Sequence, residues 1–307
     1  MRLRDTPRGD AWNVFRLVHT LRVLARDRLF VFGLAVVSAL TLLSVAAPYV
    51  SPYASQGYGE AAVPPPSCPG VATEISGVCP PSLAHPLGTE ILGRDLLTRV
   101  LFGIRTSLTI GLFVVVTATV IGLLVGMTAA YIGGWVDEVL MRTTDVFLSF
   151  PHVILALVIL ATIGPSFYGV FIALGVVWWP TFARLARGQA LSVKSQNYVL
   201  AAQAAGVGRL GIIFRHILPN SFAPLTVQMA LDMGGSILAE AGLSFLGLGV
   251  RPPTADLGVM VFESTNFITT AWWYPVFPGL FLFLLVLSFN LIGDRVTQYL
   301  DPRLAGK

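Results

Sequence analysis

Charged residues are scarce in this sequence, because Asp, Glu, Lys and Arg together make up only 12% of its 307 residues. A soluble domain carries about 25%. Hydrophobic residues account for 55%, so a water-soluble fold would need a very large core and almost no charged surface. A lipid bilayer, in contrast, accepts apolar side chains all round a helix. The composition therefore excludes an ordinary soluble domain and predicts an integral membrane protein.

Lysine is scarcer still, since only Lys194 and Lys307 occur. Neither belongs to a G-x-x-x-x-G-K-[ST] sequence, so the chain has no P-loop with which to bind ATP. The four histidines are scattered, with no H-E-x-x-H and no Cys/His ligand cluster. No serine lies in a G-x-S-x-G sequence. These absences predict a non-catalytic protein with no metal site and no cofactor of its own.

Long stretches with few or no charges predict six membrane spans, at about 20 apolar residues each. One stretch is too long for a single span, and Gly164-Pro165 near its middle predicts two helices joined by a tight hairpin. The first stretch is followed by no A-x-A cleavage site, so we expect an anchor and not a signal peptide. The stretches are Leu29–Val50, Thr106–Val136, Val146–Ala183, Ile217–Val250 (charged only at Asp232 and Glu240) and Ser264–Gly293.

The basic residues predict the orientation. With six spans both termini lie on one side, and that side receives sixteen of the 20 Lys and Arg residues. The positive-inside rule places this side in the cytoplasm, and the net charge of +4 then reflects topology and not a nucleic-acid site. The expected organisation is a cytoplasmic amphipathic tail (1–28), a first transmembrane helix (29–50), an extracytoplasmic loop with an interfacial helix (51–105), a core of five transmembrane helices (106–297) and a cytoplasmic tail (298–307).

Cysteine occurs only twice, at Cys68 and Cys79. Both lie in the Pro- and Gly-rich loop that the topology places on the oxidising side of the membrane, where a disulfide can form. Two free thiols that never meet are the alternative.

Two carboxylates lie at membrane depth in the predicted fifth span. Asp232 is near its middle, and Glu240 is two turns further along. Charges at such depth are costly and face a bundle interior or a water-filled path. Either a pathway role or a hydrogen bond to a neighbouring helix would explain each of them. Gly122 and Gly126 form a small-xxx-small pair in the second predicted span, which predicts close helix packing.

A short helix is predicted at Asn197–Gly206, inside the longest cytoplasmic loop. Its alanines leave a nearly bare surface that another protein could approach closely, and Gly206 is a typical helix stop. An ordinary loop helix of high intrinsic propensity is the alternative interpretation. The alanines are Ala201, Ala202, Ala204 and Ala205.

Six sequence blocks resemble one family, the C-type permeases of dipeptide/oligopeptide ABC importers. They occur in the family's order and cover about two thirds of the chain. The blocks are His85–Asp95 (HPLGTEILGRD), Gly133–Pro151, Ala183–Gly206, Arg215–Asn220 (RHILPN), Glu240–Pro253 (EAGLSFLGLGVRPP) and Phe289–Arg303. The resemblance implies an all-α integral membrane protein with six transmembrane helices and the MetI-like, type I importer fold, in the bacterial inner membrane.

The resemblance also implies a role for the cytoplasmic loop. In such importers it carries a motif of the form E-A-A-x3-G-x9-I-x-L-P that docks on an ATPase subunit. Leu200 stands here in place of the Glu and His216 in place of the Ile, which removes a specific ion pair but keeps the small-residue surface. The residues implied in coupling are Tyr198, Ala201, Ala202, Ala205, Gly206, Leu218 and Pro219.

The implied partners are a homologous second permease, two cytoplasmic ATPases that bind the ATP and Mg²⁺, an extracytoplasmic peptide-binding protein and the peptide itself. Within the same class of machine, nickel or another small solute could replace the peptide. An ion-coupled secondary transporter would use Asp232 and Glu240 as ion sites, but such folds often show internal repeats with paired broken helices, and no repeat is visible. A membrane enzyme or scaffold is the remaining alternative, and the missing nucleophile and metal ligands disfavour the enzyme.

Overall fold

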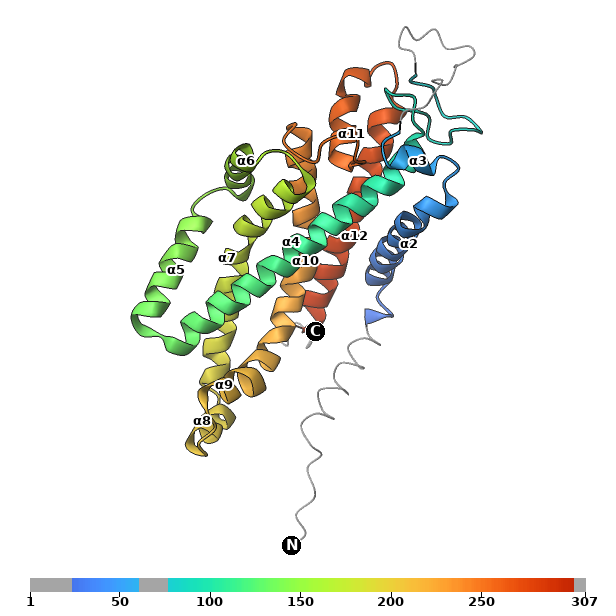
Figure 1. Ribbon diagram of the computed structural model, residues 1–307. Helices are drawn as coiled ribbons and strands as arrows, with labels where there is room; N and C mark the ends of the chain where they lie inside the picture. The colour runs from blue at the N-terminus through green and yellow to red at the C-terminus, as the bar shows by residue number, and fades with distance from the viewer. Residues whose placement is uncertain (1–23, 61–76, 301–307) are drawn as a thin grey trace.

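The computed structural model describes residues 24–60 and 77–300, and within them the chain forms helices and connecting turns (Figure 1). No strand occurs in these ranges; Thr89 and Asp95 form only an isolated antiparallel bridge. The expected all-α architecture is therefore confirmed. The helices are α2 (Arg28–Val50), α3 (Ala54–Gly57), α4 (Leu96–Ile132), α5 (Gly134–Leu148), α6 (His152–Ile163), α7 (Phe167–Lys194), α8 (Asn197–Ala204), α9 (Arg209–Ile212), the π-helix η1 (Ile213–Ile217), α10 (Leu218–Phe245), α11 (Leu257–Glu263), the 3₁₀-helix η2 (Ser264–Phe267) and α12 (Trp273–Leu300).

Four helices of the described ranges are long and apolar enough to cross a membrane, namely α2, α4, α7 and α12. The pair α5–α6 makes a fifth span if it is counted as one bent helix. The predicted span Ile217–Val250 corresponds to α10, which is 28 residues long and packs against α4, α7 and α12. Because α10 is not among the helices that meet the same test, length and composition support four or five of the six predicted spans.

The predicted run Val146–Ala183 is broken twice. The expected break occurs at Gly164, whose φ of +95° lets the chain turn between α6 and α7. A second, unexpected break at residues 149–151 sets α5 and α6 at 90° to each other. Pro151 explains it, because proline lacks an N–H and disfavours helical geometry at the residue before it. With only 12 residues, α6 is too short to cross a bilayer without α5.

Helix α4 is longer than the sequence predicted. It begins at Leu96, where the Asp95 side chain accepts a hydrogen bond of 2.8 Å from the Thr98 backbone N–H, and continues for 37 residues. At about 1.5 Å per residue it is about 56 Å long, against about 30 Å for the hydrocarbon core. The expected separate interfacial helix is therefore the first part of α4, which runs through the expected boundary between residues 105 and 106.

Gly122 and Gly126 lie where α4 packs on α7, as the small-xxx-small spacing predicted. A Cβ atom built on Gly122 would lie 2.8 Å from the Ala183 backbone nitrogen, and one on Gly126 would lie 2.4 Å from the Ala183 carbonyl oxygen. Side chains at these two positions would force the helices apart. The absence of side chains therefore permits backbone contact at the centre of the bundle.

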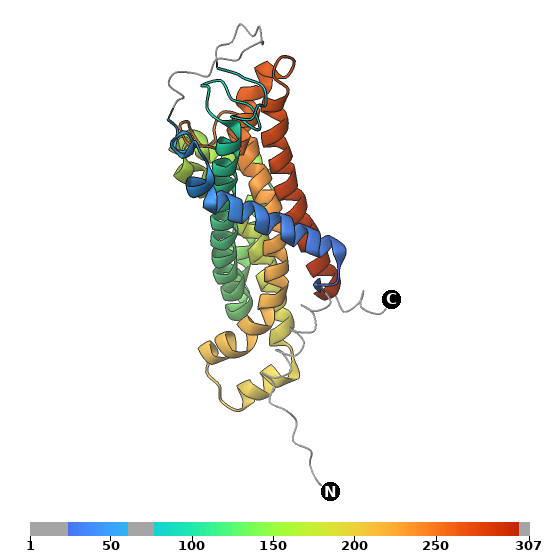
Figure 2. The same ribbon diagram turned by 90° about the vertical axis from the view of Figure 1, so that its right-hand side faces the viewer.

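The ends of the long helices define two ends of the bundle. We call the end that carries α8 the α8 end, and the opposite one, with α11 and residues 77–95, the α11 end (Figure 1). Helix α2 runs obliquely across α4 and α12 and packs on both (Figure 2). Asp27, which caps α2, lies 3.7 Å from Arg295 near the end of α12. The predicted last span starts later than expected, at Trp273, because Ser264–Phe267 form η2.

The α11 end contains buried charges that join distant segments. Arg94 pairs with Glu90 at 2.5 Å, and both side chains are at most 2% exposed. Arg99 of α4 donates to the carbonyl oxygen of Pro253 at 2.8 Å. Burial raises the pKa of the Glu263 carboxyl at the end of α11, and the negative charge of Glu90 acts in the same direction. These contacts hold α11 and residues 77–95 on the start of α4.

Cys79 lies in this buried network and is disulfide-bonded. Its backbone N–H donates to the Thr89 hydroxyl at 2.6 Å, and that hydroxyl donates to the Gly77 carbonyl oxygen at 2.6 Å. Cys68 lies outside the described residues, so its pairing with Cys79 stays a prediction.

Candidate coupling surface and polar groove

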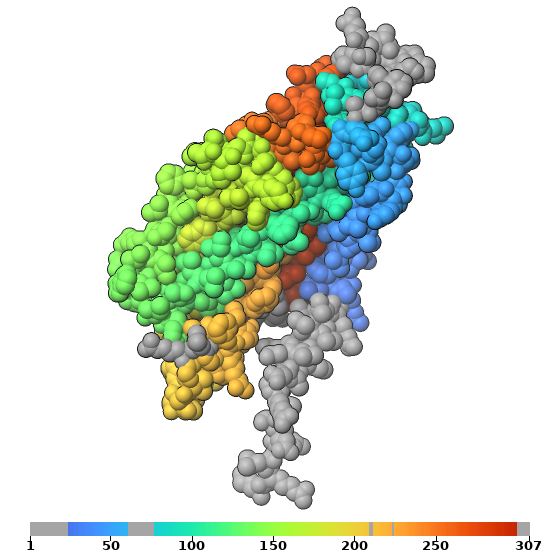
Figure 3. Space-filling model, in the orientation of Figure 1, coloured from blue at the N-terminus to red at the C-terminus, as the bar shows by residue number. Residues whose placement is uncertain are grey.

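Helix α8 projects from one end of the bundle, between α7 and α9 (Figures 1 and 3). Val199 is fully buried and anchors α8 in a cluster with Met127 and Ala130 of α4 and Ala190 and Val193 of α7. The short helix is therefore packed on the ends of two long helices, and it would move with them.

The side of α8 opposite Val199 is small and open. Ala201, Ala204 and Ala205 are exposed, and at about 100° per residue they lie across the helix from Val199. Ala202 is half-buried against the anchoring cluster. Leu200, which occupies the Glu position of the general motif, is 50% exposed on the flank. The outward surface is therefore almost bare backbone, flanked by an apolar side chain.

Gly206 ends α8 in the way that the sequence predicted. Its φ is +82°, a left-handed conformation in which a side chain would be strained. The Val207 N–H donates to the Ala202 carbonyl oxygen at 3.1 Å, and the Gly206 N–H donates to that of Gln203 at 3.0 Å. This pair of bonds is a Schellman motif. It turns the chain directly toward η1 and α10.

The other predicted coupling residues lie on both sides of this turn. The rings of Tyr198 and His216 are 6.1 Å apart between centroids, so α8 contacts the π-helix η1. Leu218 packs on the anchoring cluster and, with Phe214 and the end of α4, lines an apolar groove of about 600 Å³. Pro219 is exposed in the first turn of α10. The structure thus gathers the predicted residues at one end of the bundle.

The two carboxylates of α10 have different surroundings. Glu240 is fully buried and accepts hydrogen bonds from Ser107 of α4 at 3.0 Å and from Ser244 at 3.1 Å. It therefore joins α10 to α4. Asp232 is half-buried and accepts a bond of 3.0 Å from Gln228, with Trp178 and His152 close to its carboxylate.

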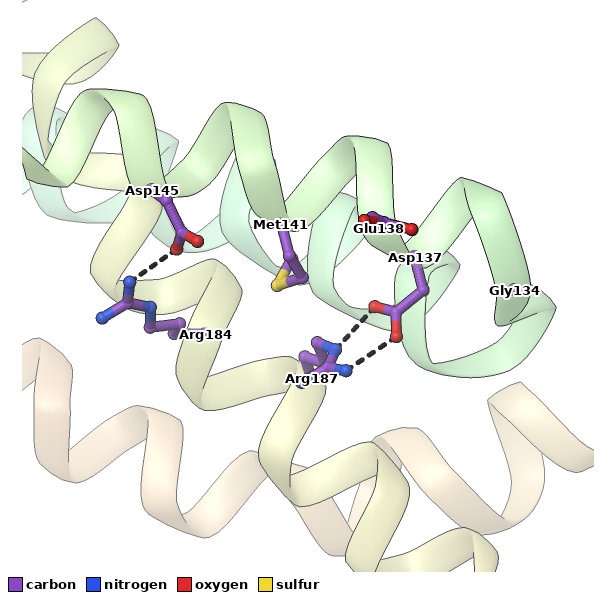
Figure 4. Close-up of a pocket in the computed structure, with 7 residues that line it drawn as sticks. All are labelled: Gly134, Asp137, Glu138, Met141, Asp145, Arg184 and Arg187. Atoms are coloured by element: carbon purple, nitrogen blue, oxygen red, sulfur yellow. Dashed lines mark hydrogen bonds and ion pairs between the residues drawn. The ribbon is translucent and has the colours of Figure 1, made fainter.

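A charged groove of about 410 Å³ lies between α5 and α7 (Figure 4). Two ion pairs cross it. Arg187 binds both carboxylate oxygens of Asp137, at 2.6 and 2.7 Å, whereas Arg184 binds one oxygen of Asp145 at 2.6 Å. Met141 lies between the two pairs, and Gly134 and Glu138 complete the lining. Both faces of the groove therefore carry charge, acidic on α5 and basic on α7.

Comparison with known proteins places this geometry in a family. Residues 118–306 match the binding-protein-dependent transport system inner membrane components, and residues 6–65 match the N-terminal transmembrane domain of oligopeptide transport permease C. The chain belongs to the binding-protein-dependent transport permeases.

Relatives of this permease match along most of its length. The dipeptide transport system permease protein DppC of Escherichia coli is 40% identical over 300 residues, covering 97% of this chain and 94% of the relative. DppC of Alkalihalophilus pseudofirmus is 38% identical, covering 92% and 88%. The probable D,D-dipeptide transport system permease protein DdpC of Escherichia coli is 44% identical, covering 74% and 76%.

A solved structure, that of an amino acid ABC transporter with histidines, has a similar fold. Its TM-score is 0.51 at 15% sequence identity, and the match covers 64% of this permease and 92% of that chain. At this identity the likeness concerns the fold alone. Together with the family match, it confirms the expected ABC permease fold.

The groove of the permease contains residues that the sequence analysis did not select. Arg184 and Arg187 were counted there only as basic residues of the cytoplasmic side, and Asp137 and Asp145 were not considered. A signal was present, because Asp137 and Asp145 are eight residues apart and Arg184 and Arg187 three apart, spacings that place each pair on one face of a helix. What the sequence did not indicate is that the two faces meet.

The surroundings of Lys194 differ from what its position predicts. Because Lys194 lies in the predicted cytoplasmic loop, just before the helix at residues 197–206, an exposed side chain on the flank of that helix is expected. In the structure its ammonium group donates to the carbonyl oxygens of Ala130 and Tyr131, at 3.1 and 3.2 Å, and lies 5.3 Å from the centre of the Tyr131 ring. It satisfies the last carbonyls of α4 and is unsuitable as a neutral control position.

The position of Asp232 leads to a prediction for the permease. Asp232→Asn keeps the size of the side chain and removes its charge, so the complex should assemble while transport per complex falls roughly tenfold, the scale of one hydrogen bond to a charged group. Asp232→Leu should in addition reduce assembly, because Gln228 loses its partner. Uptake normalised to assembled complex measures both effects. Equal loss of assembly in the two variants would instead indicate a purely structural carboxylate.

Proposed function

We propose that this permease forms half of the translocation path of an ATP-driven importer of dipeptides or oligopeptides. The names of its relatives support peptide as the substrate class, since they are dipeptide and D,D-dipeptide transport permeases. The match of residues 6–65 to the N-terminal domain of oligopeptide transport permease C supports the same class.

The observation that carries the coupling role is the geometry of α8. Its outward surface of Ala201, Ala204 and Ala205 can enter a groove that bulkier side chains could not. Its opposite side is anchored by Val199 on α4 and α7. A force applied to α8 from the cytoplasm would therefore reach both long helices as a rigid-body motion. We infer that α8 docks on a cytoplasmic ATPase and transmits its movement.

The family match supports the remaining parts of the importer, and a chain without a P-loop needs a partner to hydrolyse ATP. We infer two cytoplasmic ATPase subunits that bind ATP and Mg²⁺, a homologous second permease that completes the path, and an extracytoplasmic peptide-binding protein. The starts of α2 and α10 and the ends of α4, α7 and α12 lie toward the α8 end. The basic residues support a cytoplasmic location for that end and for both termini.

In this proposal the transport cycle is alternating access. ATP binding closes the ATPase pair, the coupling helices move with it, and the spans change from an inward-open to an outward-open packing. The permease contributes no chemistry to hydrolysis. Its contribution is a path with two stable packings and a rigid lever at the cytoplasmic end.

The experiment that tests this function compares the isolated permease with the assembled importer. The isolated chain should show no ATP hydrolysis, because no P-loop is present. The assembled importer in proteoliposomes should accumulate a labelled dipeptide only with ATP and the binding protein. Saturable hydrolysis by the isolated chain would contradict the proposal, and accumulation of nickel without dipeptide would assign the machine to another solute.

A further inference from the structure

The groove between α5 and α7 holds two ion pairs near the α8 end of the bundle. Asp145 is 11 residues from the start of α5, and Arg184 is 10 residues from the end of α7. At about 1.5 Å per residue both lie roughly 15 Å from the helix ends at the α8 end. The Arg184 and Asp145 side chains are 58% and 47% exposed, so this subunit alone does not enclose them.

The two ion pairs differ in how readily they can exchange partners. Arg187 and Asp137 are joined by two parallel hydrogen bonds, and their side chains are only 34% and 20% exposed. Such a bidentate pair is geometrically fixed. Arg184 and Asp145 share one bond and are far more exposed. An exposed single-contact pair contributes little stability, so a ligand with both charges can replace it at low cost.

A second set of polar contacts lies along α7, about 9 Å further from the α8 end than Arg184. His152 at the start of α6 lies 5.3 Å from the Trp178 ring, and Trp178 and His152 lie close to the Asp232 carboxylate of α10. Arg187, Arg184 and Trp178 follow each other along α7. Helix α7 therefore carries the basic side of the groove and, nearer the middle of the bundle, Trp178 beside the Asp232 carboxylate.

We propose that the groove between α5 and α7 is a binding stage of the translocation path, where Arg184 takes the carboxylate of a short peptide and Asp145 its ammonium group. This inference rests on the proposed function. A free dipeptide carries one charge of each sign, matching the two sides of the groove. Guanidinium groups bind carboxylates in a planar, two-bond geometry, and a volume of about 410 Å³ lies within the range of small-ligand sites. The pair Arg187–Asp137 would keep α5 and α7 together while the outer pair opens.

The test places a thiol in the groove of the assembled importer in nanodiscs. Met141→Cys lies between the two ion pairs, and Val139→Cys, 51% exposed and on the other side of α5, is the matched control. A charged, water-soluble maleimide should label Met141→Cys at least tenfold faster than Val139→Cys, with unsubstituted importer as the blank. Millimolar Ala-Ala should slow labelling of Met141→Cys, and N-acetyl-Ala-Ala-amide, which lacks both charges, should not.

A second variant assigns the protection to the residue named. Arg184→Gln in the Met141→Cys background should remove protection by Ala-Ala, measured as the ratio of labelling rates with and without peptide in the same variant. If Met141→Cys fails to label in an importer that transports dipeptide, the groove is not accessible to water and the proposal is wrong. If the blocked peptide protects as well as Ala-Ala, the groove does not recognise the charged ends of the peptide. Both outcomes leave the proposed function standing, because that function is tested separately by peptide accumulation in the unsubstituted importer and by ATP hydrolysis in the isolated chain.

Discussion

Peptide uptake is expected to fall to background when Ala201 is replaced by tryptophan. Ala201 lies across α8 from the buried Val199, on the surface that we assign to the ATPase. An indole ring there would hold the two proteins apart by several ångströms, and shape complementarity in such contacts matches that of protein interiors. The folded bundle has no reason to change, because the position is exposed. ATP-driven uptake and peptide-stimulated hydrolysis should disappear together, while the permease pair still purifies intact.

Control substitutions at Ala201 and Gly206 separate the effects of side-chain size and backbone conformation from a general effect of mutation. Ala201→Ser adds one small atom and should retain most uptake. Gly206→Val should also abolish coupling, because a β-branched residue is strained at a φ of +82°. Gly206→Asn should retain much more activity, since asparagine tolerates this conformation. Uptake near the wild-type level in Ala201→Trp, at normal expression, would show that the coupling surface lies elsewhere.

Gly126→Ala is expected to reduce the amount of folded permease sharply. The added methyl group would lie 2.4 Å from the Ala183 carbonyl oxygen and 2.8 Å from the Arg187 backbone nitrogen, so backbone must move. Overpacking of this kind costs about 1–3 kcal/mol, and here it separates the two helices that form the centre of the bundle. Tm in detergent and yield after size-exclusion chromatography measure the effect.

Gly279 provides the matched control, because a Cβ built on this glycine of α12 meets nothing within 4 Å. Gly279→Ala should leave Tm unchanged or raise it slightly, since alanine has the higher helix propensity. Gly122→Ala should resemble Gly126→Ala, with contacts of 2.4 Å to Phe182 and 2.8 Å to Ala183. The same Tm for Gly126→Ala and Gly279→Ala would mean that α4 and α7 are further apart in the membrane than in this structure.

Helix α8 shows which structural features can be predicted from neighbouring residues in the sequence. Asn197 to Gly206 could be predicted as a helix with a glycine stop because both properties depend on neighbouring residues: alanines favour the helix, and a left-handed residue after its end favours glycine. The spacing of Gly122 and Gly126 likewise predicts close helix packing. Neither pattern identifies the residues that pack against it. The contact of Gly126 is with Ala183, more than fifty residues away in the sequence. Val199 anchors α8 through contacts with two other helices, α4 and α7.

Expectations that depended on the continuity of a helix were less accurate. The run Val146–Ala183 was expected to contain one break, but the chain also bends at Pro151, because uncharged composition does not distinguish a straight helix from a bent one. An interfacial helix was expected to lead into the second span, and it proves to be continuous with that span in α4. Lys194 was expected on the exposed flank of the short helix, whereas it donates to the free carbonyls at the end of α4.

The sequence by itself determined the membrane-protein class, the all-α class and the family, and it predicted the short helix at residues 197–206 with its glycine stop. Each of these depends on composition, on period or on a motif of neighbouring residues, and none requires knowledge of which helices touch. Only the tertiary structure decided that Glu240 is bonded to Ser107 and Ser244, that Asp232 lies beside Gln228, and that Arg184 meets Asp145 across a groove. The physical reason is that burial and charge pairing are set by side chains brought together from distant helices. The sequence of one helix face does not specify which other face will pack against it.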